Sequence, residues 1–224
     1  MFFLALSGMQ WYDTVIWSSV SWFKAWDLLS DTNGFFVCLW KNIEFPQLYK
    51  KQQMKEYIFI SPMKAYKQLL SAQSIEIIHW MVKHYFSSYK HVVSLFIPSW
   101  LEDRLPKKAL KKVDYAQTCI IFPDLWTLTQ IHPVNSISSD TAILHWWMTQ
   151  VQKAKIYWGI KSGEIKQLLT TNRWLFFDRS NLQQIIVYNP SNRAYSSQSE
   201  PRFVIKEVAE KVGEVYEATL EYRA

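Results

Sequence analysis

The apolar positions in the second half of the chain form short, unbroken runs separated by stretches with helical spacing. Four runs predict strands that are buried on both faces, as in a parallel sheet: Gln117–Phe122, Thr141–His145, Gln167–Thr170 and Gln184–Val187. A helix is predicted over Met148–Ile160, between the second and third strands, and another from Val204 to about Tyr222. This alternation predicts an α/β unit with a mostly parallel sheet covered on both faces.

The spacing of apolar residues changes to three and four between Ser71 and Phe96, which predicts helices. The first helix opens at Ser71 or Ser74, because serine is a frequent N-cap residue. A second, short helix follows, and Pro98 ends it because proline has no N–H to continue the hydrogen-bond ladder.

Two apolar runs upstream predict strands, Phe35–Trp40 and Tyr57–Ile60. The stretch after Pro98 is polar and basic, which favours a connector. The sequence therefore predicts a small β-rich N-terminal domain with helices at residues 1–100, a linker at 101–116 and an α/β domain at 117–224.

The composition is that of a folded protein, because 49% of the residues are hydrophobic and 17% are aromatic. The 12 tryptophans suit a core, stacking on bases or a partner surface, and composition does not choose among these roles. The formal charge of +6 and the isoelectric point of about 9.1 are compatible with phosphate contact without being diagnostic of it. The basic residues partly cluster in lysine pairs: Lys50-Lys51, Lys107-Lys108 and Lys111-Lys112.

Nothing in the sequence indicates an oxidising compartment or a membrane. Cys38 and Cys119 each lie inside an apolar run and are expected to be buried free thiols. The N-terminus lacks a basic region and a small-residue cleavage site, so no signal peptide is expected. Because no run of about 18 apolar residues occurs, no membrane span is expected either. These features predict a cytoplasmic protein.

Several segments from Ser71 onward correspond, in the same order along the chain, to motifs of a known protein family. They are Ile78–Phe86 with Val92–Pro98, Ile120–Leu125 with Leu128-Thr129, Ala142–His145, Trp158 with Gly163-Glu164, Asn181-Leu182 with Ile185–Val187, and Tyr195 with Gln198 and Pro201–Phe203. Together they resemble the bacterial primosomal protein N′ family, the superfamily 2 DNA helicases of replication restart. The resemblance implies a domain that binds a DNA 3′ end at residues 1–100 and a single RecA-like helicase lobe at 117–224.

The chain departs from that family where ATP chemistry would take place. A phosphate-binding loop needs glycines, and none occurs between Pro98 and Gln117. The family's strand end V-P-E-I reads Phe122-Pro123-Asp124-Leu125 here, and a four-residue segment replaces its acidic box: Tyr188, Asn189, Pro190 and Ser191. ATP hydrolysis needs a phosphate grip and a metal-binding carboxylate together. The sequence therefore predicts no catalytic residues, no cofactor and no enzyme.

The candidate binding residues are basic and aromatic. Residues carried over from the resemblance, or chosen for their charge, are Trp40, Lys41, Lys50, Lys51, Lys107, Lys108 and Arg173. Arg173 lies where the family has a G-T-R-S motif. Stacking on single-stranded bases contributes about 1–3 kcal/mol per base, so a few exposed rings beside lysines suffice for binding. The expected partners are single-stranded or forked DNA and replication proteins.

Other residue groups predict structure rather than chemistry. The five histidines lack a cysteine or carboxylate that would complete a metal-binding set. Asp178 and Arg179 are expected in a turn as a capping or surface pair. Trp146-Trp147 follows a predicted strand, so one of the two rings must face outward or meet another element, which indicates an interface.

Two functions of different classes remain open, with an unrelated enzyme as a third. The first is a non-catalytic DNA-binding or replication-associated protein. The second is a protein–protein interaction module on a RecA-like scaffold, without nucleic-acid activity.

Overall fold

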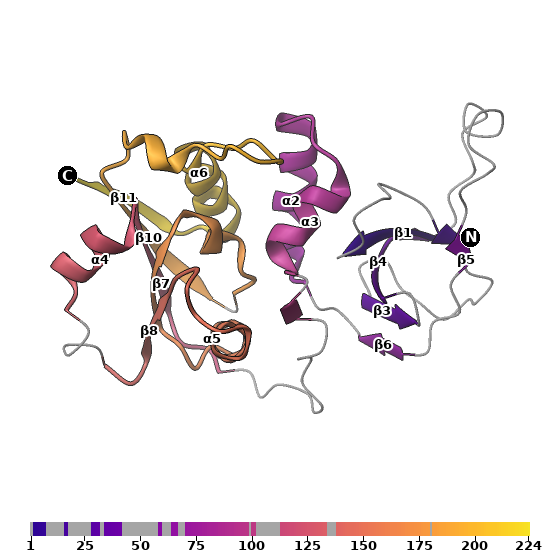
Figure 1. Ribbon diagram of the computed structural model, residues 1–224, viewed down its shortest axis with the longest axis horizontal. Helices are drawn as coiled ribbons and strands as arrows, with labels where there is room; N and C mark the ends of the chain where they lie inside the picture. Colours follow the sequence, from indigo (N-terminus) through magenta and orange to yellow (C-terminus); the bar gives the residue numbers. More distant parts are fainter. Residues whose placement is uncertain are drawn as a thin grey trace.

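A computed structural model describes most of the second half of the chain and short segments of the first (Figure 1). The described residues are 2–7, 16–17, 28–31, 34–41, 58–59, 64–66, 70–98, 100–101, 113–133, 138–179 and 181–224.

A five-stranded sheet forms the centre of the larger part of the molecule. Its strands are β7 (Gln117–Phe122), β8 (Thr141–Leu144), β9 (Gln167–Thr171), β10 (Leu182–Tyr188) and β11 (Thr219–Arg223). Their spatial order is β11-β10-β7-β9-β8, and every neighbouring pair is parallel. The four strands predicted from unbroken apolar runs are therefore adjacent and parallel, which confirms the α/β prediction.

Both faces of the sheet are buried. Inward residues of one face, such as Cys119, Ile185 and Val187, belong to the main hydrophobic cluster, and α5 (Gln150–Ser162) and α6 (Ile205–Tyr216) contribute to it. The opposite face has a smaller cluster against α4 (Leu125–Ile131). Because adjacent residues of a strand point to opposite faces, unbroken apolar runs are what a doubly covered sheet requires.

The helix bounds follow local capping. Helix α5 begins at a capping box between Thr149 and Gln152 and ends at Gly163, whose φ of 85° suits a residue without a Cβ. The predicted helix Met148–Ile160 was therefore right in type and displaced by two residues at each end.

The prediction that the last helix continues to Tyr222 is wrong. Helix α6 ends at Tyr216, Glu217 adopts a left-handed φ of 55°, and the chain then enters β11. The N–H of Ala218 donates to the carbonyl of Gly213, which closes the helix end. Beyond it, polar and apolar residues alternate with the period of a strand, and this pattern prevails over the interleaved charges.

Two N-terminal helices pack against the α/β sheet unit, and in Figure 1 they lie between it and the N-terminal strands. Helix α2 (Ala72–His84) begins at the N-cap Ser71 and helix α3 (Tyr89–Phe96) at Ser88, which confirms the predicted helices. Their buried residues share the main cluster with the sheet, and the Phe96 ring lies 5.5 Å from the Phe176 ring. The linker 101–116 falls largely outside the described residues, so the domain boundary stays a prediction.

A buried polar cluster joins α2 to the α/β unit. Asp178, only 3% exposed, accepts hydrogen bonds from the Ser71 N–H (3.0 Å) and from the hydroxyls of Ser71 and Ser74. Its second carboxylate oxygen pairs with the ammonium of Lys161 on α5. The carboxylate thus lies at the N-terminus of α2, where the helix dipole favours a negative charge.

Arg179 is as buried as Asp178, so the expectation of a surface pair is wrong. Its guanidinium donates to the carbonyls of Leu175 (2.6 Å) and Phe177 (2.7 Å) and to the sulfur of Cys119 (3.1 Å). Cys119 is a buried free thiol, as predicted, and burial raises its pKa.

Four of the N-terminal strands form an antiparallel sheet, and two others form a parallel pair. The strands β1 (Phe2–Ser7), β3 (Leu28–Asp31), β4 (Gly34–Lys41) and β6 (Lys64–Tyr66) form a sheet in the order β1-β4-β3-β6, while β2 (Ile16–Trp17) pairs with β5 (Ile58–Phe59). The predicted strand Phe35–Trp40 lies within β4, and β5 lies within the predicted Tyr57–Ile60. Within the described residues, no helix is long and apolar enough to cross a lipid bilayer.

Candidate functional site

The topology of the sheet marks one place for a site. The chain leaves β7 toward β8 and β9 on one side, and it leaves β10 toward β11 on the other. In α/β folds, ligands bind outside the carboxyl ends of strands at such a switch in direction. The carboxyl ends of β7 and β10 meet here, and the rings of Phe122 and Tyr188 stack with centroids 4.8 Å apart.

Pro123 and Asp124 follow β7 at this place. Pro123 is buried, and Asp124 is the N-cap of α4. The Asp124 carboxylate accepts hydrogen bonds from the N–H of Thr127 (2.7 Å) and from its hydroxyl (3.1 Å). This carboxylate therefore caps the start of α4, where it satisfies a backbone N–H that would otherwise lack a partner.

The residues after β10 form a tight, well-bonded turn. Asn189 adopts a left-handed φ of 48°, and its N–H donates to the carbonyl of Arg223 (2.7 Å). The Asn192 side chain accepts from the N–H of Ala194. The buried Tyr195 hydroxyl donates to the carbonyls of Ile121 and Tyr188, so this phenol fixes the turn between the two strand ends.

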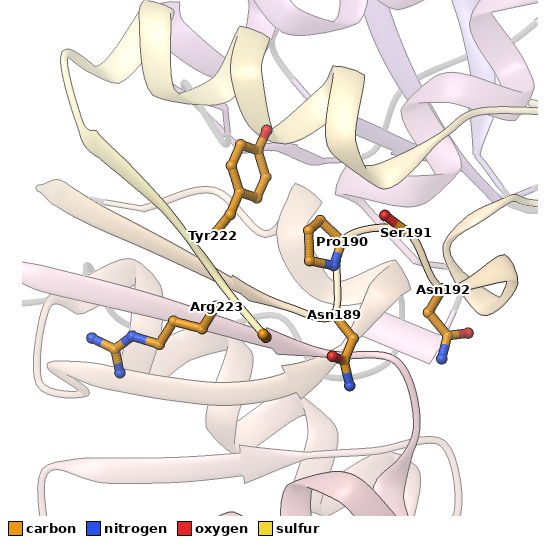
Figure 2. A pocket seen from close by; sticks show the side chains of 7 residues that line it. Asn189, Pro190, Ser191, Asn192, Tyr222 and Arg223 are labelled. Atoms are coloured by element: carbon orange, nitrogen blue, oxygen red, sulfur yellow. The ribbon is translucent and has the colours of Figure 1, made fainter.

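This turn borders a shallow pocket of about 430 Å³ (Figure 2). Seven residues line it: Asn189, Pro190, Ser191, Asn192, Tyr222, Arg223 and Ala224. None of these side chains is a carboxylate, and the Arg223 side chain extends away from Asn189 and Asn192 (Figure 2). The guanidinium binds Glu221 (2.7 Å) and the Tyr188 hydroxyl (3.2 Å) instead. The pocket offers amide and hydroxyl groups for hydrogen bonds, but no acid or nucleophile–base pair.

Two titratable groups near the pocket have pKa values shifted in favour of their uncharged forms. Burial, together with the positive charge of Arg223, lowers the pKa of His132, whose ring meets the Phe122 ring edge-on at 5.8 Å. Burial also raises the pKa of Tyr195. Among the described residues, no group of three or more His, Cys, Asp or Glu side chains is placed to hold a metal ion.

Exposed tryptophans occupy the same carboxyl edge of the sheet. Trp126 lies in the first turn of α4, after β7, and is 72% exposed. Trp146 and Trp147 follow His145 just beyond the end of β8 and are 64% and 65% exposed, with their ring centroids 4.8 Å apart. We call the last two the tryptophan pair. Large exposed apolar side chains that cluster in this way mark binding surfaces.

A lysine accompanies the tryptophan pair. The Lys153 ammonium on α5 donates to the carbonyl of Trp146 (2.7 Å) and lies 5.6 Å from the centre of the Trp174 ring. Trp174 belongs to the short helix η3 (Asn172–Phe176), which follows the carboxyl end of β9. The edge therefore combines exposed rings with a fixed positive charge.

The structure places only part of the predicted binding set. Arg173 lies in η3, so its backbone is at the same edge as the tryptophan pair. Trp40 and Lys41 lie in β4, where only the backbone is described. The remaining four fall outside the described residues: Lys50, Lys51, Lys107 and Lys108. The sequence analysis did not single out Trp126 or Lys153. Trp126 comes shortly after the end of a predicted strand, and Lys153 lies near the start of a predicted helix.

Comparison with models of known protein families and with curated proteins gives no match for this chain.

Proposed function

We propose that this chain is a non-catalytic, replication-associated protein that binds single-stranded or forked DNA along the carboxyl edge of a RecA-like lobe. The five-stranded parallel sheet is compatible with such a lobe. Two positions that correspond to primosomal protein N′ motifs, the similar Pro123-Asp124 and the departing segment Tyr188–Ser191, flank the switch point of that sheet. The identity of the lobe and the DNA partner are inferred from this resemblance together with the site.

One observation carries the proposal: the tryptophan pair is exposed at the edge where α/β sheets bind ligands. Base stacking on such rings is tolerant of sequence, and a nearby cation such as Lys153 suits the phosphate backbone. Single-stranded DNA offers both unpaired bases and phosphates.

Substitution of the tryptophan pair tests the DNA-binding proposal. We expect Trp146→Ala/Trp147→Ala to weaken binding of a labelled single-stranded oligonucleotide by about 30-fold or more, because two stacking platforms are lost. Fluorescence anisotropy at low ionic strength, repeated at increasing salt, measures the affinity and its electrostatic part. A forked duplex and a blunt duplex, measured in parallel, report the preference for unpaired strands.

A matched control is Phe86→Ala. Phe86 is 95% exposed in the turn between α2 and α3, so its removal deletes an exposed ring outside the proposed edge and is expected to leave the affinity unchanged. Wild-type protein that shows no salt-sensitive binding would contradict the proposal. Equal affinities for the double variant and the wild type would move the site away from the tryptophan pair.

The pocket chemistry predicts that the chain does not hydrolyse ATP. None of its lining side chains is a carboxylate that could hold magnesium or orient water, and both roles are required for phosphoryl transfer. We expect phosphate release at the level of the buffer, with or without single-stranded DNA. Turnover that needs Mg²⁺, is abolished by EDTA and follows the chain through size-exclusion chromatography would contradict this expectation.

A protein–protein interaction module is the second candidate. It is favoured by Val151, 66% exposed in the first turn of α5, because a side chain that cannot stack on bases extends the apolar surface close to the tryptophan pair. This candidate predicts no DNA binding by the wild type at any salt concentration, so the same anisotropy series separates the two functions.

A further inference from the structure

Strand β11 lies at an edge of the five-stranded sheet. Among the described strands it pairs with β10 alone (Figure 1). The Arg223 carbonyl accepts the Asn189 N–H, so the backbone of Arg223 faces β10. Because backbone groups alternate along a strand, those of Thr219 and Glu221 also face β10, while those of Leu220 and Tyr222 face outward. An edge with outward N–H and C=O groups is a template for another strand.

The side chains of this edge form two different rows. Leu220 packs against the main cluster, and the Tyr222 hydroxyl donates to Glu210 of α6 (3.0 Å), so this row lies on the α6 face. On the other face, the Arg223 guanidinium binds the Glu221 carboxylate. The edge therefore presents an apolar row and a row in which opposite charges are two residues apart.

We propose that a second copy of this chain occupies the edge, with β11 pairing antiparallel to the partner's β11 about a two-fold axis at Tyr222. Outward-facing residues must oppose outward-facing residues, which limits the possible registers. In the register centred on Tyr222, Glu221 of each copy lies opposite Arg223 of the other, at the position where antiparallel strands approach most closely. The two-fold axis makes this contact twice, so the strand is complementary to itself.

The neighbouring registers are less favourable. A register centred on Glu221 would place the two Glu221 carboxylates directly opposite each other, and like charges at that position destabilise a pair. A register centred on Leu220 would require Glu217 and Ala218 to pair, yet both lie before β11 and Glu217 has a left-handed backbone. Charge and backbone geometry thus select the register centred on Tyr222.

The dimer would join two five-stranded sheets into one continuous sheet. The two halves run in opposite directions, so the carboxyl edges point away from each other and both tryptophan pairs stay accessible. The proposed dimer leaves the proposed DNA-binding edge open, and it rests on no part of the DNA-binding proposal. A contact between two short strands belongs to the small interfaces, below about 1,200 Å² in total, which are typical of weak association.

Sedimentation equilibrium of the full chain, from about 1 μM to several hundred μM, tests the dimer, since small interfaces dissociate in this range. We expect a reversible monomer–dimer equilibrium. Arg223→Glu and Glu221→Arg each place like charges opposite each other and should weaken the dimer at least about 10-fold, while the double variant Glu221→Arg/Arg223→Glu should restore it. Circular dichroism confirms that each variant is folded.

A backbone variant tests the pairing itself. Tyr222→Pro removes one outward N–H at the proposed axis and spares the hydrogen bonds to β10, so the folded monomer should persist and the dimer should be lost. A chain that stays monomeric at the highest concentration would overturn the inference. A dimer that is unaffected by Tyr222→Pro, or that the charge-swapped double variant does not restore, would overturn it as well.

Discussion

Replacing Asp178 by alanine is expected to lower the free energy of unfolding by about 3–5 kcal/mol, because it breaks a buried ion pair. The Lys161 side chain is only 12% exposed and pairs with this carboxylate. The same substitution removes the acceptor for the Ser71 N–H and for two serine hydroxyls. Urea unfolding monitored by circular dichroism measures the loss.

Two further variants separate the contribution of the ion pair to stability from that of the hydrogen bonds. Asp178→Asn keeps an oxygen that can accept from Ser71 and Ser74, so its loss of stability should come mainly from the missing ion pair with Lys161 and be smaller. Lys161→Met removes the cation but leaves the carboxylate with its three donors, and it should also be milder than Asp178→Ala. If all three variants lose the same stability, the donors from α2 contribute nothing.

The chain offers a matched control in Asp140 and Lys166. Their side chains form the same kind of ion pair at 2.9 Å, but they are 37% and 44% exposed. Water screens such a pair, so Asp140→Ala should change the stability little. A comparable loss at both aspartates would show that burial does not govern the effect at Asp178.

Phe176→Ala is expected to cost about 3–5 kcal/mol of stability, since it opens a cavity in a core that cannot fully collapse. Phe176 is 1% exposed, and its ring lies 5.5 Å from Phe96 of α3 and 5.0 Å from Phe203 before α6. One side chain thus fills the space among three elements. Equilibrium unfolding in urea, with the slope compared between variants, gives the change.

Phe86→Ala serves as the control for the same chemical change. Its side chain is 95% exposed, so the stability should stay within about 0.5 kcal/mol of the wild type. A loss below about 1 kcal/mol at Phe176 would mean that the surrounding helices relax into the space, contrary to the packing described above.

The sheet was predictable because its sequence signal is local. Each of the strands β7, β8, β9 and β10 is a short apolar run of the kind that a doubly buried strand requires. Strand β11 was missed because charged residues continue without a break from α6 across Glu217, and the left-handed turn there has no glycine to announce it. A turn at a residue other than glycine or proline leaves little signal in the local sequence pattern.

The site was predictable in part for the same reason. The strand ends at Asp124 and Asn189 follow from the strand assignments, and parallel strands place their carboxyl ends at one edge. The sequence predicted that one ring of the tryptophan pair faces outward or meets another element, but it did not predict that both rings are exposed, because a tryptophan has the same letter in a core and on a surface. The buried partnership of Asp178 was also hidden, since Ser71 and Ser74 lie 107 and 104 residues away along the chain.

That separation has a consequence for the newly made chain. Translation proceeds at about 5–20 residues per second, so the start of α2 is synthesised roughly 5–20 seconds before Asp178. Through that interval the apolar side of α2 has none of its partners from η3 or α6, and a chaperone or a neighbouring nascent chain has time to bind it. The yield of folded protein should therefore depend on how quickly the C-terminal half follows.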